Sequence, residues 1–367
     1  MKYKNYKLEE LATIKYGKNQ KKVISDNGHI PIYGTGGLMG YATEALYDKP
    51  SVLIGRKGTI EKVRYVTHPF WTVDTLFYTI IQDNIVLPHY LYYLMSLLDL
   101  KKFNEGTTIP SLRTETLNRI EFNVPELEYQ SKVLSILEPI EEKIDTNNLI
   151  NKNLEEQAKT VFEKEFLAGD HVPAGWTRGS LVDIADYLNG LAMQKYRPAA
   201  GEQGLPVLKI KELRQGSCDS NSELCSSSIK KDYIIHDGDV IFSWSGSLIV
   251  DFWCGGTCGL NQHLFKITSK KYDKWFYYAW TNSYLQKFAA IAADMATTMG
   301  HIKREELAKA EVLIPNNCDY ERIGNLLSPI YALIISNRIE NRRLASLRDG
   351  LLPQLMAGTL DVTDIEL

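Results

Sequence analysis

Two loops of this 367-residue chain carry side chains suited to contacting a nucleic acid. The first loop, Gly55-Arg56-Lys57-Gly58-Thr59, is basic and follows a run of strand-forming residues. The second, Ser243-Trp244-Ser245-Gly246-Ser247, follows a similar run but is polar and aromatic. Phosphates are bound by cations, and base edges are read by donors and acceptors such as those of Arg, Gln, Asn and Ser. The loops therefore predict contacts with nucleic acid; the alternative for any single cation is an ordinary solvated side chain.

Positive charge gathers outside one long acidic segment. Seven lysines lie within the first 22 residues, opposed there only by Glu9 and Glu10, and Lys209, Lys211 and Arg214 form a second basic stretch. Residues 126–165, in contrast, contain ten acidic residues and five lysines. Hydroxyl pairs at residues 107–108 and 297–298 could bond phosphates or cap helices or turns. The local distribution favours nucleic-acid binding even though the net charge of the whole chain is −3.

Motifs for catalysis, nucleotide binding and metal binding are absent from the sequence. It contains no GxxxxGK[ST], GxSxG or HExxH motif, and no Asx-Pro-Pro-aromatic motif of amino-group DNA methyltransferases. The glycine run 34–40 has Met39 where a dinucleotide-binding fingerprint needs its third glycine. Cys254, Cys258 and His263 lack an evident fourth zinc ligand, so buried thiols are the better interpretation. We therefore expect no catalytic residue, metal or cofactor in this chain.

The chain presents one order of motifs twice. Seven short matches recur in the same order, and from residue 107 onward the offset is a constant 190. Each half predicts short strands with glycine-rich turns, then a short aromatic helix, then a long helix. The predicted fold class is α+β, with globular α/β domains at residues 1–125 and 169–315. Long helices are expected at residues 126–168 and, with the carboxyl-terminal tail, at 316–367.

Both long helices carry apolar residues at heptad spacing, which predicts that each buries a narrow stripe against a partner helix. The stripe comprises Val133, Leu137, Ile140, Ile144, Asn147, Asn151 and Leu154 in the first helix and Ile323, Leu327, Ile330, Ile334, Asn337, Asn341 and Leu344 in the second. We expect antiparallel pairing as a coiled coil, with the asparagines paired to fix the register; the alternative is that they face solvent. Such pairing implies a pseudo-two-fold, near-circular organisation. Pro139 and Pro329 predict a kink or a restart.

Composition is that of a globular protein. Hydrophobic residues make up 44% of the chain, enough to exclude disorder as its main state. No apolar run reaches the roughly 20 residues of a membrane span, and the amino terminus lacks a signal core. The five cysteines are an odd number, and none occurs in the first 217 residues. We therefore expect a reducing, cytoplasmic location.

With these features the chain resembles the specificity (S) subunit of type I restriction–modification systems over essentially its whole length. The resemblance rests on the order of the four segments and on the strings at residues 30–34, 53–58, 106–112 and 124–130. The second half departs at 299–302, where Met-Gly-His-Ile replaces Ile-Pro-Ser-Leu, and at 315–321, which lacks the usual Glu-Gln pair.

The resemblance implies that the two globular parts are target-recognition domains, each reading half of a split, asymmetric double-stranded DNA site. The helices would space them and dock two modification (methyltransferase) subunits, and restriction (motor-nuclease) subunits would join. S-adenosylmethionine, ATP and Mg²⁺ are expected on those partners, not in this chain. The candidate partner surface is the heptad face left over after helix pairing, together with further apolar helix residues: Leu149, Ile150, Leu326, Leu333 and Leu347. The candidate DNA contacts by position are Lys18, Gly34, Thr35, Gly36, Arg56, Lys57, Thr107 and Thr108, then Lys209, Lys211, Ser243, Trp244, Ser245, Gln262, Thr297 and Thr298.

Two other functions compete with DNA reading. A coiled-coil scaffold whose globular parts bind protein or RNA predicts little salt dependence of duplex DNA binding, whereas a DNA reader predicts a steep one. An enzyme with an unrecognised site is the weakest alternative, because the two halves share no nucleophile–base or paired-acid motif.

Overall fold

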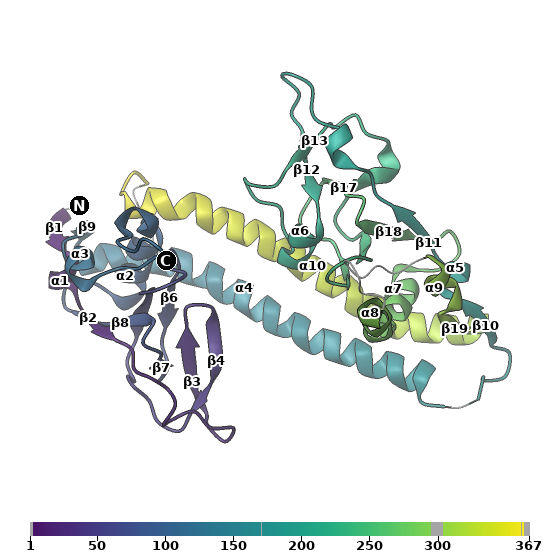
Figure 1. Cartoon of the computed structure of the whole chain (residues 1–367), viewed down its shortest axis with the longest axis horizontal. Helices are drawn as coiled ribbons and strands as arrows, with labels where there is room; N and C mark the ends of the chain where they lie inside the picture. Colours follow the sequence, from purple (N-terminus) through teal and green to yellow (C-terminus); the bar gives the residue numbers. More distant parts are fainter. Residues whose placement is uncertain (1–2, 170, 295–303, 361, 363–367) are drawn as a thin grey trace. The chain divides into compact units, whose positions relative to one another are not determined.

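The computed structural model describes residues 3–169, 171–294, 304–360 and 362. The chain divides into two compact units (Figure 1). Unit 1 comprises Met1–Glu141 with Ser346–Leu367, and unit 2 comprises Glu142–Ala345. The division crosses both long helices, so each unit contains part of α4 (Leu127–Phe162) and part of α10 (Asn317–Met356).

A four-stranded antiparallel sheet forms the centre of unit 1. Its strands, in sheet order, are β2 (Ala12–Tyr16), β8 (Leu76–Ile81), β5 (Ser51–Gly55) and β6 (Val63–Val66). Strand β5 is buried along its whole length, as its run of apolar residues predicts. The one hydroxyl in it, Ser51 Oγ, donates to the backbone oxygen of Thr79 at 2.8 Å, so the buried polar group is satisfied.

Smaller elements surround this sheet. A hairpin with one parallel neighbour is built from β4 (Gly37–Ala42), β3 (Ile30–Gly34) and β7 (Trp71–Thr72), and β1 (Tyr3–Lys7) pairs with β9 (Glu121–Pro125). The helical elements are α1 (Leu8–Leu11), α2 (Pro88–Ser96), the 3₁₀ turn η1 (Leu100–Phe103) and α3 (Thr114–Asn118). The end of α10 returns to this core, because Leu352, Leu355 and Val362 are buried in one cluster with α1, α2 and the start of α4.

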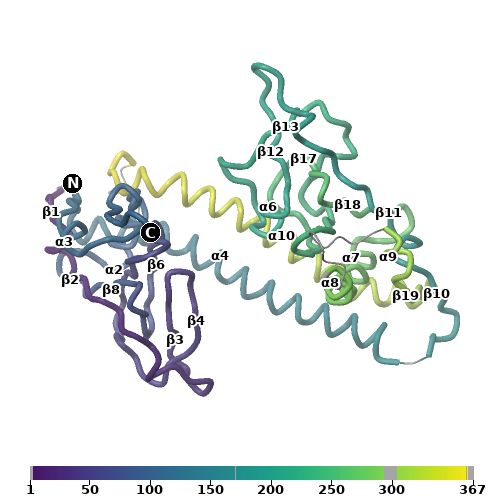
Figure 2. Tube along the Cα trace, viewed as in Figure 1, coloured from purple at the N-terminus to yellow at the C-terminus, as the bar shows by residue number. Residues whose placement is uncertain are grey.

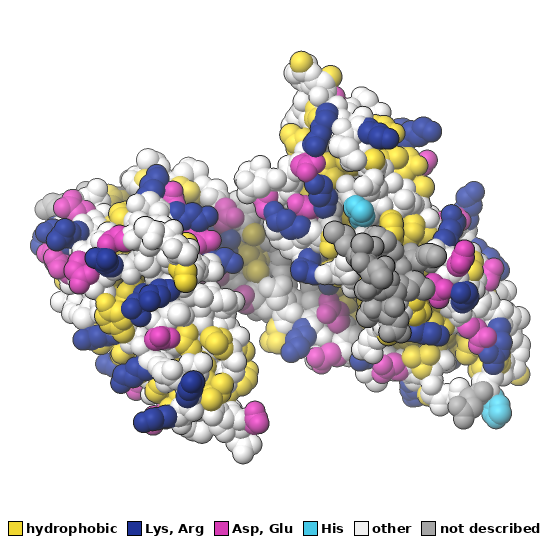
Figure 3. All heavy atoms as spheres, in the orientation of Figure 1, with side chains coloured by type: hydrophobic (Ala, Val, Ile, Leu, Met, Phe, Trp, Pro, Cys, Tyr) yellow, Lys and Arg dark blue, Asp and Glu magenta, His cyan; other side chains and the backbone are white. Residues whose placement is uncertain are grey.

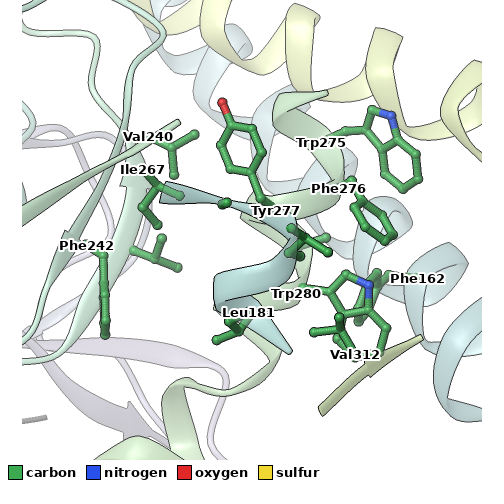
Figure 4. Packing of buried hydrophobic residues seen from close by; sticks show 14 of the residues in the cluster. Phe162, Leu181, Val240, Phe242, Ile267, Trp275, Phe276, Tyr277, Trp280 and Val312 are labelled. Carbon is green, nitrogen blue, oxygen red and sulfur yellow. The ribbon is translucent and has the colours of Figure 1, made fainter. Parts of the chain in front are cut away.

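Unit 2 repeats the same topology, which can be followed along the trace in Figure 2. Its main sheet is β11 (Asp186–Asn189), β18 (Leu264–Thr268), β15 (Val240–Ser243) and β16 (Ile249–Phe252), and β10 (Thr177–Ser180) pairs with β19 (Glu311–Ile314). Helices α5 (Leu181–Ile184), α7 (Lys274–Ser283) and α9 (Arg304–Lys309) correspond in order to α1, α2 and α3. Figure 4 shows the aromatic core between this sheet, α7 and the end of α4. The duplication expected from the sequence is therefore present element by element.

Unit 2 also has elements without a counterpart in unit 1. Its small sheet contains β13 (Leu224–Cys225), β12 (Leu205–Leu208) and β17 (Cys258–Leu260), which pair as β4, β3 and β7 do in unit 1, and it adds a fourth strand, β14 (Ile234–Ile235). The added helical segments are α6 (Ile210–Gln215), α8 (Leu285–Asp294) and the 3₁₀ turns η3 (Met193–Lys195) and η4 (Lys231–Tyr233). These insertions explain why the sequence offset between the halves varies before residue 107.

The parts of α4 and α10 within unit 2 run antiparallel and are joined by asparagine pairs. Asn147 Nδ2 donates to Asn341 Oδ1 at 2.8 Å, and Asn337 Nδ2 donates to Asn151 Oδ1 at 2.9 Å. Asn147, Asn151 and Asn337 are buried, so the solvent-facing alternative is wrong for these three. The predicted stripe residues on both helices are all buried or half-buried.

Ion pairs fasten the helices to the globular part of unit 2. Arg338 on α10 donates to Asp251 on β16 at 2.6 Å and to Glu155 on α4 at 2.8 Å. Arg322 makes two bonds with Glu165, of 2.9 and 2.7 Å, in the π-helical turn η2 (Glu163–Leu167) that follows α4.

The expected restart at the two prolines is wrong. Helix α4 continues through Pro139 and α10 through Pro329 as single assigned helices. Each proline costs its helix one backbone bond, and the packing of the helices outweighs that local cost. Among the described residues, no helix is both long and apolar enough to cross a membrane.

Candidate nucleic-acid interface

In unit 1 the candidate contacts gather at one edge of the four-stranded sheet, where β2 and β5 end and β8 begins. Lys18 lies just beyond β2 and is tied to β7, since its backbone N–H donates to Thr72 O at 2.8 Å. Its carbonyl accepts a bond from the indole of Trp71 at 2.9 Å. The Lys18 side chain is exposed on this supported backbone, as phosphate binding requires.

Arg56 lies at the same edge, two residues after Ile54. Its guanidinium packs over the ring of Tyr16 at 5.0 Å, and Nη1 donates to the backbone oxygen of Asp74 at 2.8 Å. These contacts hold the planar group in one orientation, which lowers the entropy cost of binding a ligand. Arg56 is thus a pre-positioned donor rather than a freely solvated cation.

The loop that carries Thr107 and Thr108 lies beside the Arg56 loop. Gly58 N donates to Pro110 O at 2.9 Å, and Leu112 N donates to Arg56 O at 2.9 Å. Asn104 Oδ1 shapes the loop by accepting from the N–H groups of Gly106 and Ser111, both at 2.9 Å. Thr107, Thr108 and Lys57 are exposed on these paired loops. The threonines precede α3, which starts at residue 114, so they do not cap that helix.

The turn between β3 and β4 borders a hollow of about 260 Å³ lined by Gly34, Thr35, Lys62, Arg64 and Tyr92, among others. Gly34 itself is buried, and an added Cβ there would lie 2.3 Å from the Met39 sulfur. Thr35 is half-buried and Gly36 exposed. Gly34 is therefore a structural residue of the turn, and the exposed surface is provided by its neighbours.

Unit 2 presents the corresponding sheet edge, at the ends of β11 and β15 and the start of β18. Trp244 Nε1 donates to Asn189 Oδ1 at 3.1 Å, and the indole packs near the rings of His263 and Phe265, at 6.0 and 5.7 Å. Gln262 is half-buried beside His263, with Nε2 atoms 3.4 Å apart. Trp244 and Gln262 therefore both lie beside His263 at this edge.

Ser243 and Ser245 point into the protein and need correction as DNA contacts. Ser243 is 0% exposed and donates to the Ser245 carbonyl at 3.2 Å, while Ser245 is 2% exposed and bonds His263 Nδ1 at 3.2 Å. Their hydroxyls are satisfied within the unit, so they shape the loop instead of reaching a ligand.

The two lysines near α6 are neutralised by neighbours. Lys209 pairs with Glu223, which also pairs with Arg197 at 3.0 Å, and Lys211 pairs with Asp219 at 3.3 Å. These cations offer less net positive charge to a phosphate than Lys18 or Lys57. Thr297 and Thr298 lie outside the described residues. Figure 3 shows Lys and Arg side chains spread over the visible surface of both units, interspersed with acids.

Three residues of the edges were missed by the sequence reasoning: Tyr16, Asn189 and His263. Tyr16 and Asn189 each precede a glycine, Gly17 or Gly190, that the duplication matches. The matched glycines could have pointed to the positions of Tyr16 and Asn189. They could not have indicated the contacts of these residues with Arg56 and Trp244, because those contacts depend on strand register.

Metal-site geometry is not found in the described part of the chain, where no cluster of three or more His, Cys, Asp or Glu side chains could hold an ion. Cys254 and Cys258 are buried, and burial raises the pKa of the Cys254 thiol to about 11. A thiolate ligand is therefore disfavoured at Cys254.

The chain is similar to known proteins of one kind. Residues 1–156 and 173–347 match the profile of the type I restriction modification DNA specificity domain. The type I restriction enzyme MjaIX specificity subunit of Methanocaldococcus jannaschii is 25% identical over 349 residues, covering 87% of this chain and 80% of that protein. The HindI specificity subunit of Haemophilus influenzae is 21% identical, covering 79% and 81%.

A solved structure agrees at the level of the fold. The S subunit of a type I restriction-modification system from M. genitalium superposes with a TM-score of 0.66 at 13% identity, covering 97% of this chain and 96% of that one. The profile match spans most of the sequence and both copies of the duplicated unit. The chain therefore belongs to the family of type I restriction–modification DNA specificity subunits.

Proposed function

We propose that this chain reads a two-part, asymmetric site in double-stranded DNA, one part with each unit. The observation that carries the proposal is the pair of equivalent sheet edges. Each edge is built on the same backbone, yet one presents Arg56 and Lys18 and the other presents Asn189 and Trp244. Two readers of one fold with different side chains suit a site whose halves differ in sequence.

The chain recruits the catalytic machinery and does no chemistry itself. Methyltransferase subunits dock on the paired helices through exposed apolar residues: Leu149, Ile150, Leu326, Leu333 and Leu347. Such residues outside a core mark protein contacts when they cluster. Motor-nuclease subunits join that assembly, and S-adenosylmethionine, ATP and Mg²⁺ bind to the partners.

Binding measured at several salt concentrations tests the proposal. The probe is the complex of this chain with its modification subunit, with duplex DNA containing the motif found by methylation-site mapping. Affinity is expected to fall steeply and log-linearly with salt, as counterion release from phosphates requires. A salt-independent affinity, or equal binding to an RNA of the same sequence, contradicts DNA reading and supports a scaffold with protein- or RNA-binding units.

A further inference from the structure

The strand registers identify one position that is the same in both units. In unit 1, Tyr16 on β2 and Ile54 on β5 both pair with Phe77 of β8. In unit 2, the residues paired with Phe265 of β18 are Asn189 on β11 and Phe242 on β15. Tyr16 and Asn189 are therefore structural equivalents.

The same register matches the loop residues that contact them. Arg56 is two residues beyond Ile54, and Trp244 is two residues beyond Phe242. Each loop residue touches the strand residue of its own unit, Arg56 on Tyr16 and Trp244 on Asn189. We call Tyr16–Arg56 and Asn189–Trp244 the edge pairs.

The backbone beneath the edge pairs is alike in the two units. Gly17 N donates to Leu76 O at 3.0 Å, and Gly190 N donates to Leu264 O at 3.0 Å. A Cβ at either glycine would lie 2.0 or 2.2 Å from a backbone carbonyl oxygen, so neither position accepts a side chain. The backbone at this position is thus the same in both units, while the side chains of the edge pair differ. The glycines support the backbone, and the edge-pair side chains are the candidates for selecting a base pair.

In the edge pair of unit 1, the Arg56 guanidinium offers donors only. Tyr16 is 51% exposed, and the Arg56 guanidinium lies over its ring with Nη1 bonded to Asp74 O. The remaining guanidinium N–H groups form a rigid fork that matches two neighbouring acceptors. In the major groove, the O6 and N7 atoms of guanine are such a pair.

The edge pair of unit 2 offers the exposed amide of Asn189. The Trp244 N–H donates to Asn189 Oδ1, which uses the only donor of the indole and orients the exposed amide. An amide supplies both a donor and an acceptor, and these match N7 and N6 of adenine.

We propose that the edge pairs are one specificity-determining position used twice, selecting a G·C pair in the half-site of unit 1 and an A·T pair in that of unit 2. This proposal rests on the proposed function, because it assumes that each unit reads DNA.

Methylation-site mapping with the intact complex of this chain and its modification subunit tests the proposal. Arg56→Ala is expected to relax the preference at one G·C pair of one half-site by about 10- to 100-fold, leaving the other half-site unchanged. Arg56→Lys keeps the charge but loses the rigid fork, so it is expected to relax the preference at the same G·C pair by a smaller factor, and it guards against misfolding of the alanine variant. Asn189→Ala is expected to relax one A·T pair of the other half-site.

Lys57→Ala is the matched control, because Lys57 is the exposed neighbour of Arg56 in the same loop. It is expected to weaken methylation of all sequences alike and to leave the motif intact. If the wild type yields a two-part motif that Arg56→Lys and Asn189→Ala leave unaltered, the edge-pair proposal is overturned and the proposed function stands. If the wild type yields no DNA motif, the proposed function itself fails.

Discussion

At the scale of single residues, His89 is a titratable group of unit 1 that lies between two aromatic rings and two carboxylates. It stacks between the rings of Tyr65 and Tyr93, at 4.5 and 4.6 Å, and its two nitrogens contact Glu138 at 2.9 Å and Glu141 at 3.1 Å. Burial lowers the pKa of His89, but the two carboxylates outweigh burial and raise it above 6.5. When protonated, the imidazolium therefore forms ion pairs that join α2 to α4.

This arrangement predicts how the stability of the chain depends on pH. Because the folded pKa of His89 is raised, its contribution is complete below the unfolded value of 6.5 and is lost as pH rises through the folded value. The Glu141 carboxylate behaves oppositely. Burial raises its pKa, but the hydrogen bonds with His89 and Tyr93 outweigh burial and lower the pKa below 4.5. Its contribution to stability is therefore lost in acid. Thermal unfolding of the full chain should show a midpoint that falls as pH rises above about 6.5.

The matched variant is His89→Gln, which keeps a polar side chain without a titratable charge. It is expected to cost about 1 kcal/mol at pH 6, a value reduced by partial solvent screening, and to flatten the pH dependence above 6.5. If the unfolding midpoint of this variant depends on pH above 6.5 as steeply as that of the wild type, the titration belongs to another group.

At the scale of elements, Gly17 and Gly190 are required where β2 and β11 end. An added Cβ meets backbone oxygen at 2.0 Å in one case and 2.2 Å in the other, and neither backbone can yield without breaking its bond to β8 or β18. Gly17→Ala and Gly190→Ala should each destabilise the chain by about 2 to 4 kcal/mol. Gly36→Ala is the control, since nothing lies within 4 Å of its added Cβ, and thermal unfolding of all three variants measures the difference.

The asparagine pairs make a second prediction for the helices. Asn147→Leu alone removes the donor to Asn341 Oδ1, while Asn341 Nδ2 keeps its bond to Asn148, and should cost about 1 to 3 kcal/mol. The double change Asn147→Leu with Asn341→Leu places two apolar residues opposite each other and should cost less than the sum of the single changes. Thermal unfolding of the four proteins of this cycle measures the coupling, and strict additivity would mean that the two side chains act independently.

The elements differ in how far the sequence could predict them. The heptad stripes and the order of strands were predictable, because periodicity records which face is buried. The inward orientation of Ser243 and Ser245 was not, since their bonds to a carbonyl and to His263 depend on how the loop closes over β18. Likewise, the neutralisation of Lys209 depends on Glu223, which strand pairing of β12 and β13 brings alongside.

At the scale of the whole molecule, the duplication keeps the buried scaffold the same while the exposed residues differ between the two units. The buried registers are the same in both units, so the scaffold is specified twice by similar apolar patterns. The exposed edges differ, with charge and a stacked arginine in one unit and a ring-bound amide in the other. Under the proposed function, a chain with one fold and two surfaces can combine two independent base preferences, which a single unit cannot do.

The docking surface proposed on the helices can be tested apart from the proposed DNA reading. Leu149 on α4 and Leu333 on α10 are 70% and 46% exposed, although they lie on helices whose other face is buried. If they dock the modification subunit, Leu149→Lys with Leu333→Lys should abolish co-purification with that subunit, because a buried unpaired charge opposes association.

Leu224→Lys is the matched control at 47% exposure on β13, and it should leave co-purification intact. Thermal unfolding should be within about 0.5 kcal/mol of the wild type for all of these exposed sites. Retention of the modification subunit by the double variant would place the docking surface elsewhere.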